Sequence, residues 1–267
     1  MTVPLAIPMT PAVMARVQRV SATARAVLEA ASLVPGSIEL SLVGALAQPS
    51  GTQGVDECVN AGLLHWAQRG LAFRHELARR AVEEALSPLR RRDMHARIYL
   101  QLQQQSDELV DRSAYHAQHA GDSAAVLATA PAAAARAAEL GAHREAAAHY
   151  RVALHHAQRA GDEQRAELLE RWAYECALTS AVGHAVIEAR LQALALRRSL
   201  GQVEKVGQNQ RGLSSLYRTL GQLDEARQWL DTAIATLESI DPSAELAMAY
   251  SNCAQRNPNW KKSGVSQ

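Results

Sequence analysis

Two interleaved series of glycines divide the second half of this sequence into segments of similar length. The first series recurs every forty residues and consists of Gly121, Gly161 and Gly201. The second lies half a period out of phase and consists of Gly141, Gly183 and Gly221. The sequence before the break also repeats, because Tyr115–Asp122 and His155–Asp162 share His-Ala-Gln-x-Ala-Gly-Asp. Breaks at such intervals are typical of an α-solenoid, in which stacked helices form a binding surface.

The segments between these glycines have the composition of helices. Hydrophobic residues make up 48% of the chain but aromatic residues only 4%, so the apolar content is mostly Ala, Leu and Val. Ala and Leu are strong helix formers. We therefore expect helices near residues 109–120, 123–139, 143–159, 163–180, 184–199, 204–219, 223–239 and 243–254.

Two segments follow a tetratricopeptide-like pattern of small residues. Gly-x4-Ala-x3-Tyr-x2-Ala is formed by Gly141, Ala146, Tyr150 and Ala153. The same spacing, with leucine in the aromatic place, is formed by Gly221, Ala226, Leu230 and Ala233. Tyr217 stands where the preceding helix of that repeat would carry a tyrosine. Alanines let antiparallel helices approach closely while the larger residue fills the space between them, so we expect these residues to pack the repeats. The period exceeds the about 34 residues of an ordinary tetratricopeptide unit.

The first part of the chain, to about residue 105, does not follow this rhythm. We expect a helix or helix pair over 11–34, a helix capped by Ser37 to about residue 47, and a short helix over 55–61. Two apolar runs, 63–66 and 71–74, flank a turn that contains Gly70 and predict a β-hairpin. Helices should follow over 76–86 and 88–104, the second with Ser87 as N-cap and Pro88 at its first position. This order is typical of a winged helix.

The expected fold is therefore mainly α-helical. Residues 1–105 would form a winged-helix-like domain with one β-hairpin, and residues 106–255 a tetratricopeptide-like solenoid. Residues 256–267 are polar and predict a disordered tail. The last helix lacks a partner helix, so we expect self-association through its exposed apolar surface.

The motifs of several enzyme classes are missing from the sequence. It contains neither a phosphate-binding Gly-x4-Gly-Lys-Ser/Thr loop, nor a dinucleotide fingerprint, nor a Gly-x-Ser-x-Gly nucleophile motif. His75-Glu76 begins like a zinc-protease motif, but Arg79 occupies the place of the second histidine. We expect no enzymatic activity. For the other histidines, among them His116 and His119, we favour structural or surface roles near helix ends over metal ligation.

Charge and cysteine content limit the partners. The formal net charge is +1, so no overall field would attract nucleic acid. A local basic stretch contains Arg79, Arg80, Arg90, Arg91, Arg92 and Arg97. It could contact DNA phosphates, but we favour a solvated helix face paired with nearby acids. Three widely spaced cysteines predict a reducing, cytoplasmic location, and we expect no membrane span because no apolar run reaches about 18 residues.

Several segments resemble the middle region of large ATP-binding LuxR-type transcriptional regulators, which belong to the STAND class of signal-transduction ATPases. The segments are residues 21–34, 56–64, 71–86, 121–122 and 143–150. The resemblance covers about residues 10–255. It implies the order ATPase, winged helix, tetratricopeptide-like array and helix-turn-helix, of which this chain would contain the second and third.

This resemblance implies a function and one candidate site residue. The chain would be a truncated or partial regulator that senses signals and binds a protein or small-molecule inducer on its helical repeats. A histidine after the hairpin contacts the phosphate of bound ADP in that class, and His75 matches it within Phe73-Arg74-His75-Glu76-Leu77. Because the chain has no ATPase motif, we expect no cofactor without a separate ATPase domain. The alternatives are a stand-alone scaffold or adaptor and, less favoured, DNA binding by the winged helix. For the helix-start position of His75 taken alone, a local capping role is the simpler interpretation.

Overall fold

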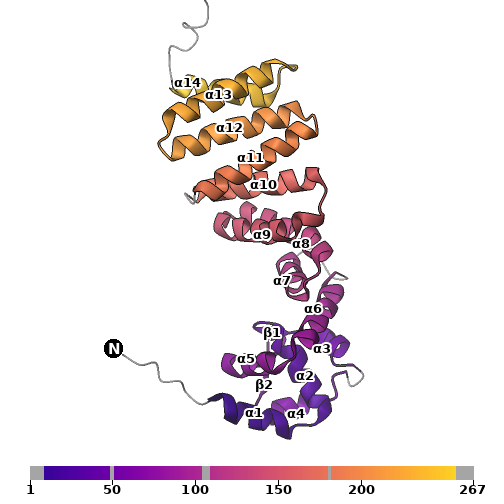
Figure 1. Cartoon of the computed structure of the whole chain (residues 1–267). Coiled ribbons are helices and arrows are strands. Elements are labelled where there is room, and N and C mark those ends of the chain that lie inside the picture. Colours follow the sequence, from indigo (N-terminus) through magenta and orange to yellow (C-terminus); the bar gives the residue numbers. More distant parts are fainter. Residues whose placement is uncertain (1–8, 49–50, 104–108, 180–181, 257–267) are drawn as a thin grey trace, which may run out of the picture. The chain divides into compact units, whose positions relative to one another are not determined.

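The computed structural model describes residues 9–48, 51–103, 109–179 and 182–256, and within them the chain forms helices and one small sheet (Figure 1). This confirms the mainly α-helical class and the solenoid-like array. The chain divides into two compact units, residues 1–125 and 126–267. The tail expected over 256–267 lies, beyond Arg256, outside the described residues.

The first unit has the element order of a winged helix. It contains α1 (Met9–Arg19), α2 (Ala22–Ser32), β1 (Ser37–Ile38), α3 (Leu40–Leu46), α4 (Val55–Asn60), β2 (Leu64–Ala67), β3 (Gly70–Phe73), α5 (Glu76–Ala85), α6 (Pro88–Leu102) and α7 (Val110–Ala120). The core is built from large aliphatic side chains of most of these elements, among them Leu28, Ile38, Leu71, Met94 and Ile98, each no more than 1% exposed. The helix expected to begin the array, α7, packs against α6 and belongs to this unit.

The sheet corrects one expectation from the sequence. Ser37 does not cap a helix, because Ser37 and Ile38 form a strand that pairs antiparallel with Ala72 and Leu71. The strand order is β1-β3-β2, so the expected hairpin gains a third strand. Burial of Ile38 beside Leu71 favours this pairing. Glu39 is the N-cap residue of α3 and has no side-chain capping bond. The other expected cap is confirmed, because Ser87 Oγ accepts a hydrogen bond from Arg90 N at 3.2 Å.

The second unit is a series of helices in which sequence neighbours pack together (Figure 1). The elements are α8 (Ser123–Glu139), α9 (His143–His156), the 3₁₀ turn η2 (Ala157–Arg159), α10 (Asp162–Leu178), α11 (His184–Ser199), α12 (Val203–Thr219), α13 (Leu223–Glu238) and α14 (Ala244–Arg256). The helices α12 and α13 pack closely, because a Cβ on Gly207 would lie 2.4 Å from Leu237 Cγ. Among the described helices, none has the length and apolar character required to span a bilayer.

Candidate functional site

The second unit contains a cavity lined almost entirely by charged and polar side chains. Its volume is about 420 Å³. The lining residues come from α10, α11 and α12 and are Glu163, Glu167, Glu170, Arg171, Tyr174, Arg190, Arg197, Lys205 and Gln208. The five from α10 follow a helical spacing of three and four, so they lie along one face of that helix. The cavity is therefore a product of helix stacking rather than of a loop.

A buried ion pair forms the base of this site. Arg197 Nε and Nη2 donate to the two oxygens of Glu170 at 2.9 and 2.8 Å. The side chains of Arg197 and Glu170 are 5% and 12% exposed. Asn209, which is fully buried, adds a hydrogen bond from its Nδ2 to Glu170 Oε1 at 2.5 Å. This two-pronged geometry holds the Glu170 carboxylate with both oxygens occupied.

The surroundings of Glu170 also act on its ionisation. Burial alone would raise the pKa of Glu170, but the hydrogen bonds from Arg197 and Asn209 outweigh it, and the pKa is lowered. The Glu170 hydrogen bond likewise raises the pKa of Arg197. Both groups therefore stay charged, and the pair is a fixed element of the site.

Arg190 is a cation of a different kind. Its Nη1 donates to the backbone carbonyl of Glu170 at 3.4 Å, a long hydrogen bond. Its Nε is buried and has no hydrogen-bond partner among the described residues. Burial lowers the pKa of Arg190, and the Glu170 charge opposes this only in part. The guanidinium packs against α12, where a Cβ on Gly212 would come within 2.4 Å of Nη2. The glycine thus provides the space that the Arg190 side chain fills.

The remaining lining residues are mostly exposed. The Arg171 and Glu167 side chains are 61% and 58% exposed, and their closest charged atoms lie 3.9 Å apart. Lys205 Nζ donates to Gln208 Oε1 at 3.1 Å. Tyr174 is 54% exposed and offers an aromatic face at the cavity. The site combines a rigid buried base with an adaptable rim, which suits recognition of a ligand with hydrogen-bonding groups.

The structure places His75 at the start of α5, as the sequence predicts, but with its side chain exposed. Its backbone carbonyl accepts hydrogen bonds from Ala78 N at 2.9 Å and Arg79 N at 3.2 Å. His75 is therefore the N-cap residue of α5, as expected for a local capping role, but it caps with its backbone carbonyl and its side chain makes no capping hydrogen bond. The position leaves the imidazole accessible to another molecule.

The residues expected to pack the repeats lie at the helix contacts of the second unit. Ala146, Ala153, Ala226 and Ala233 are fully buried, Leu230 is 2% exposed and Tyr150 is 5% exposed. Tyr217 is half-buried against the core. Gly141 and Gly221 end their helices with positive φ angles of 76°. None of these residues lines the charged cavity, so they set the spacing of the array without forming its site.

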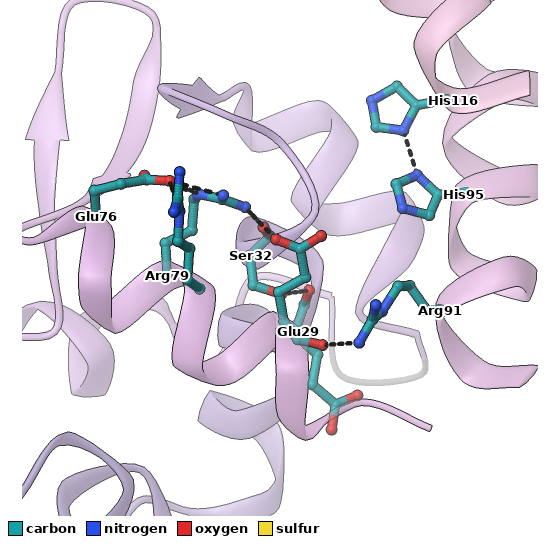
Figure 2. Close-up of polar contacts among 9 residues, drawn as sticks. Glu29, Ser32, Glu76, Arg79, Arg91, His95 and His116 are labelled. Carbon is teal, nitrogen blue, oxygen red and sulfur yellow. Dashed lines mark hydrogen bonds and ion pairs between the residues drawn. The ribbon is translucent and has the colours of Figure 1, made fainter. Parts of the chain in front are cut away.

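The basic stretch of the first unit makes mostly local bonds. Arg79 is buried and pairs with Glu76 and Glu83 at 2.8 Å while its Nη1 donates to the Ser32 carbonyl (Figure 2). Arg91 donates to the Glu83 carbonyl at 2.8 Å. Pairing of Arg79 with nearby acids is confirmed, but its placement on a solvated face was wrong, because the guanidinium reaches the end of α2.

A histidine pair is buried between α6 and α7. His95 and His116 are 0% and 1% exposed, and their Nδ1 atoms lie 2.8 Å apart (Figure 2). Of the structural or surface roles expected for His116, the buried position corresponds to the structural one. His119 is exposed and its Nδ1 lies 2.8 Å from the Tyr115 carbonyl of its own helix. Within the described ranges, no group of three or more His, Cys, Asp or Glu could hold a metal ion.

The charged cavity was not among the sites expected from the sequence. One signal was available: Glu163, Glu167, Glu170 and Tyr174 share one face of a helix at intervals of four, three and four. A second was the polar pair Asn209-Gln210 in the middle of a helix, where the structure buries both side chains. Neither signal reveals that Arg190 and Arg197, from another helix, meet this face.

The comparisons with known proteins add no relationship: no protein-family model matches the sequence, and no curated protein does either. The resemblance to LuxR-type regulators therefore remains a prediction.

Proposed function

We propose that the chain is a signal-sensing and interaction module, and that its helical array binds a small molecule or a protein segment in the cavity between α10, α11 and α12. The observation that carries this proposal is the Glu170–Arg197 pair with the incompletely bonded Arg190 beside it. Burying charges costs several kcal/mol each. A network that only held helices together could be replaced by apolar residues without loss of stability.

The dimensions and chemistry of the cavity support a binding role. About 420 Å³ falls in the usual range of small-molecule sites. Stacked helical repeats commonly place such sites on their side-chain surfaces. The lining offers donors, acceptors and one aromatic ring, but among the described lining residues no serine or cysteine is present to act as a nucleophile. Recognition is the chemistry that this set of residues supports best.

We further propose that this module belongs to the LuxR-type ATPase class of regulators. The winged-helix order of the first unit supports this assignment, because that class joins such a domain to a helical array. His75 would then sense the ADP phosphate when an ATPase domain is present, and its exposed position is compatible with that role. Ligand binding to the array would be the input signal.

A thermal-shift screen of the full chain against small metabolites and short peptides tests the binding proposal. A ligand of the cavity should raise the melting temperature in a concentration-dependent manner. Tyr174→Ala should weaken binding of that ligand, because Tyr174 lines the cavity. Tyr174 is also exposed enough to be truncated without loss of the fold. Arg198→Gln, an exposed change on α11, should leave binding unchanged. Absence of any stabilising compound or peptide would contradict the proposal.

An adaptor function is a second candidate, favoured by a more apolar groove on the same unit. This groove has a volume of about 300 Å³ and is lined mainly by α9, α10 and α11. Its lining includes the apolar Trp172 and Ala147 and the basic Arg144 and Arg151. Such a groove fits a protein segment with apolar and acidic residues. Peptides of that composition should then bind to the wild-type chain. Trp172→Ala should lower their affinity, and Tyr174→Ala should not.

A further inference from the structure

We infer that Arg190 binds the anionic oxygens of a small organic ligand, a carboxylate or a phosphate group. This inference rests on the proposed function, because it assigns a chemical class to the ligand of the cavity between α10, α11 and α12.

Arg190 has donor capacity that the protein does not use. A guanidinium carries five N–H donors in a planar fork. The only hydrogen bond of Arg190 among the described residues is the 3.4 Å contact of Nη1 with the Glu170 carbonyl. Nε is buried without a partner. A buried donor without a partner is unfavourable, and more so when it is charged. Arg190 lines the cavity, so an anion that enters it would supply acceptors to the terminal N–H groups that the protein leaves unused.

The neighbouring carboxylates of the described residues do not accept hydrogen bonds from Arg190. Glu170 is the nearest buried acid, and its two oxygens are taken by Arg197 and Asn209. Glu163 and Glu167 line the cavity but are 70% and 58% exposed. In the described residues no ion pair joins either of them to Arg190. The charges of Glu170 and Glu245 act on Arg190, but no ion pair joins it to an acid in the described residues, and it lines the cavity.

The charge of the cavity lining favours an anion over a cation. The lining includes Arg171, Arg190, Arg197 and Lys205 against Glu163, Glu167 and Glu170. The four cations exceed the three acids by one, and the best-held acid is already neutralised by Arg197. Lys205 has one side-chain hydrogen bond, to Gln208, and lies on an exposed part of α12. Lys205 can therefore turn toward a bound anion at little cost.

The packing of Arg190 indicates that its position is held by the helices. Gly212 gives the guanidinium its space, because any Cβ there would meet Nη2, Nε and Cζ within 2.7 Å. The Nε and Nη2 edge of the guanidinium thus lies against Gly212, and the N–H groups of Nη1 and Nη2 outside that edge are the ones left for a ligand. A guanidinium held in place before binding loses little entropy when an oxygen of a carboxylate or phosphate accepts from it. The cavity volume limits the ligand to a small organic anion.

The test measures binding of two simple anions to the full chain by calorimetry and thermal shift at fixed ionic strength. Succinate represents the carboxylate class, inorganic phosphate the phosphate class, and succinamide is the neutral analogue. We expect one of the two anions to bind saturably and to raise the melting temperature, and succinamide to do neither. The anion that binds identifies which chemistry the site takes.

Variants then assign the effect to Arg190. Arg190→Met should weaken anion binding by about tenfold or more, while the melting temperature without anion stays equal or rises, because a poorly bonded buried cation is removed. Lys205→Gln, a surface change that does not affect the fold, should weaken binding several-fold and reduce its salt dependence. Arg198→Gln on the same helix as Arg190 serves as the matched control and should bind like the wild type.

The outcomes separate this inference from the proposed function. Equal anion binding by Arg190→Met and wild type, or no anion binding to the wild type, would overturn the role of Arg190. The proposed function would survive either result if a neutral compound or peptide from the screen still required Tyr174. If Arg190→Met fails to fold, Arg190 has a structural role, and unchanged anion binding by Lys205→Gln would then overturn the inference.

Discussion

Arginine side chains bond to the ends of helices throughout the first unit. Arg79 donates to the carbonyl of Ser32 at the end of α2, and Arg91 to Glu83 near the end of α5. Two further contacts, Arg92 to the Ala120 carbonyl and Arg97 to the Ala45 carbonyl, reach the ends of α7 and α3 at 3.2 and 2.8 Å. The last carbonyls of a helix have no partner within the helix and carry its negative dipole end, so a cation there is favourable.

The buried pair of Arg197 and Glu170 provides the first prediction at the level of residues. Arg197→Met should destabilise the array by about 3–5 kcal/mol, because it leaves the Glu170 carboxylate buried with its main partner removed. The double variant Arg197→Met, Glu170→Met should lose less stability than Arg197→Met alone. Urea unfolding of the two single variants and the double variant measures this coupling. Additive effects would contradict the buried-pair interpretation.

The histidine pair predicts a pH dependence. Burial, together with the charges of His119 and Arg91, lowers the pKa of His95 from 6.5 to about 4. Burial, with His95, Arg112 and His119, lowers the pKa of His116 to about 3. Above about pH 4, both rings are therefore mostly neutral in the folded protein. In the unfolded chain, the same two histidines bind protons below about pH 6.5. Stability is fully present above pH 6.5 and should fall as the pH decreases toward 4 and then 3.

Urea unfolding across this range, followed in the first unit, checks the pH dependence. The change should be on the order of 3 kcal/mol for His95, at about 1.4 kcal/mol per pKa unit. The double variant His95→Gln, His116→Gln should have a flatter profile below pH 6.5. His75→Gln, which changes an exposed histidine of the same unit, should follow the wild type. An equally steep profile in the double variant would show that other groups cause the acid sensitivity.

At the level of elements, the repeated glycines end or begin helices in two different ways. Gly221 ends α12 with φ of 76°, its amide donating to Arg218 O while Gln222 N donates to Tyr217 O. This is the Schellman arrangement, which requires a left-handed residue. Gly161 instead precedes α10 as its N-cap, with φ of −65° and ψ of 157°. Gly161 of the first series and Gly221 of the second thus serve opposite ends of helices.

Two substitutions should separate these roles. Gly221→Ala should destabilise the second unit by about 1–2 kcal/mol, because L-residues are disfavoured in the left-handed region. Gly161→Ser should be neutral or stabilising by a few tenths of a kcal/mol, since serine is a better N-cap and nothing lies within 4 Å of a Cβ there. Thermal unfolding of the two variants measures the difference. Equal losses would mean that both glycines have the same role.

At the level of the whole molecule, charge and the winged-helix order bear on nucleic-acid binding. The helix that precedes the hairpin, α4, takes the place of a recognition helix and carries Asp56 and Glu57. Glu57 is tied to Ser21, whose amide donates to its Oε1 at 2.8 Å. With a formal net charge of +1, the chain as a whole has no positive field to attract phosphates, and the acidic residues of α4 disfavour them.

We therefore predict no saturable, salt-dependent binding to duplex DNA near about 50 mM salt, where phosphate contacts are strong. Fluorescence anisotropy of a labelled duplex with the full chain measures this. The exposed Arg69 in the hairpin turn is the residue that would report a wing contact. DNA binding that weakens in Arg69→Gln would contradict the prediction and favour the DNA-binding alternative.

The sequence by itself determined most helix boundaries, the hairpin and the packing positions. These depend on local signals such as apolar periodicity, the Ser87-Pro88 start of α6 and glycines at helix ends, all of which lie within a few residues of the structure they specify. The expected helices over 123–139, 184–199 and 223–239 match α8, α11 and α13 to within one residue.

Only the tertiary structure decided which polar groups meet. The third strand at Ser37–Ile38 forms because β3 lies beside it, and the charged cavity forms because α10, α11 and α12 bring Glu170, Arg190 and Asn209 together. Burial converts these groups from ordinary surface residues into a network with strict bonding needs. The sequence gives the residue types. It does not show the burial that leaves donors of Arg190 without partners.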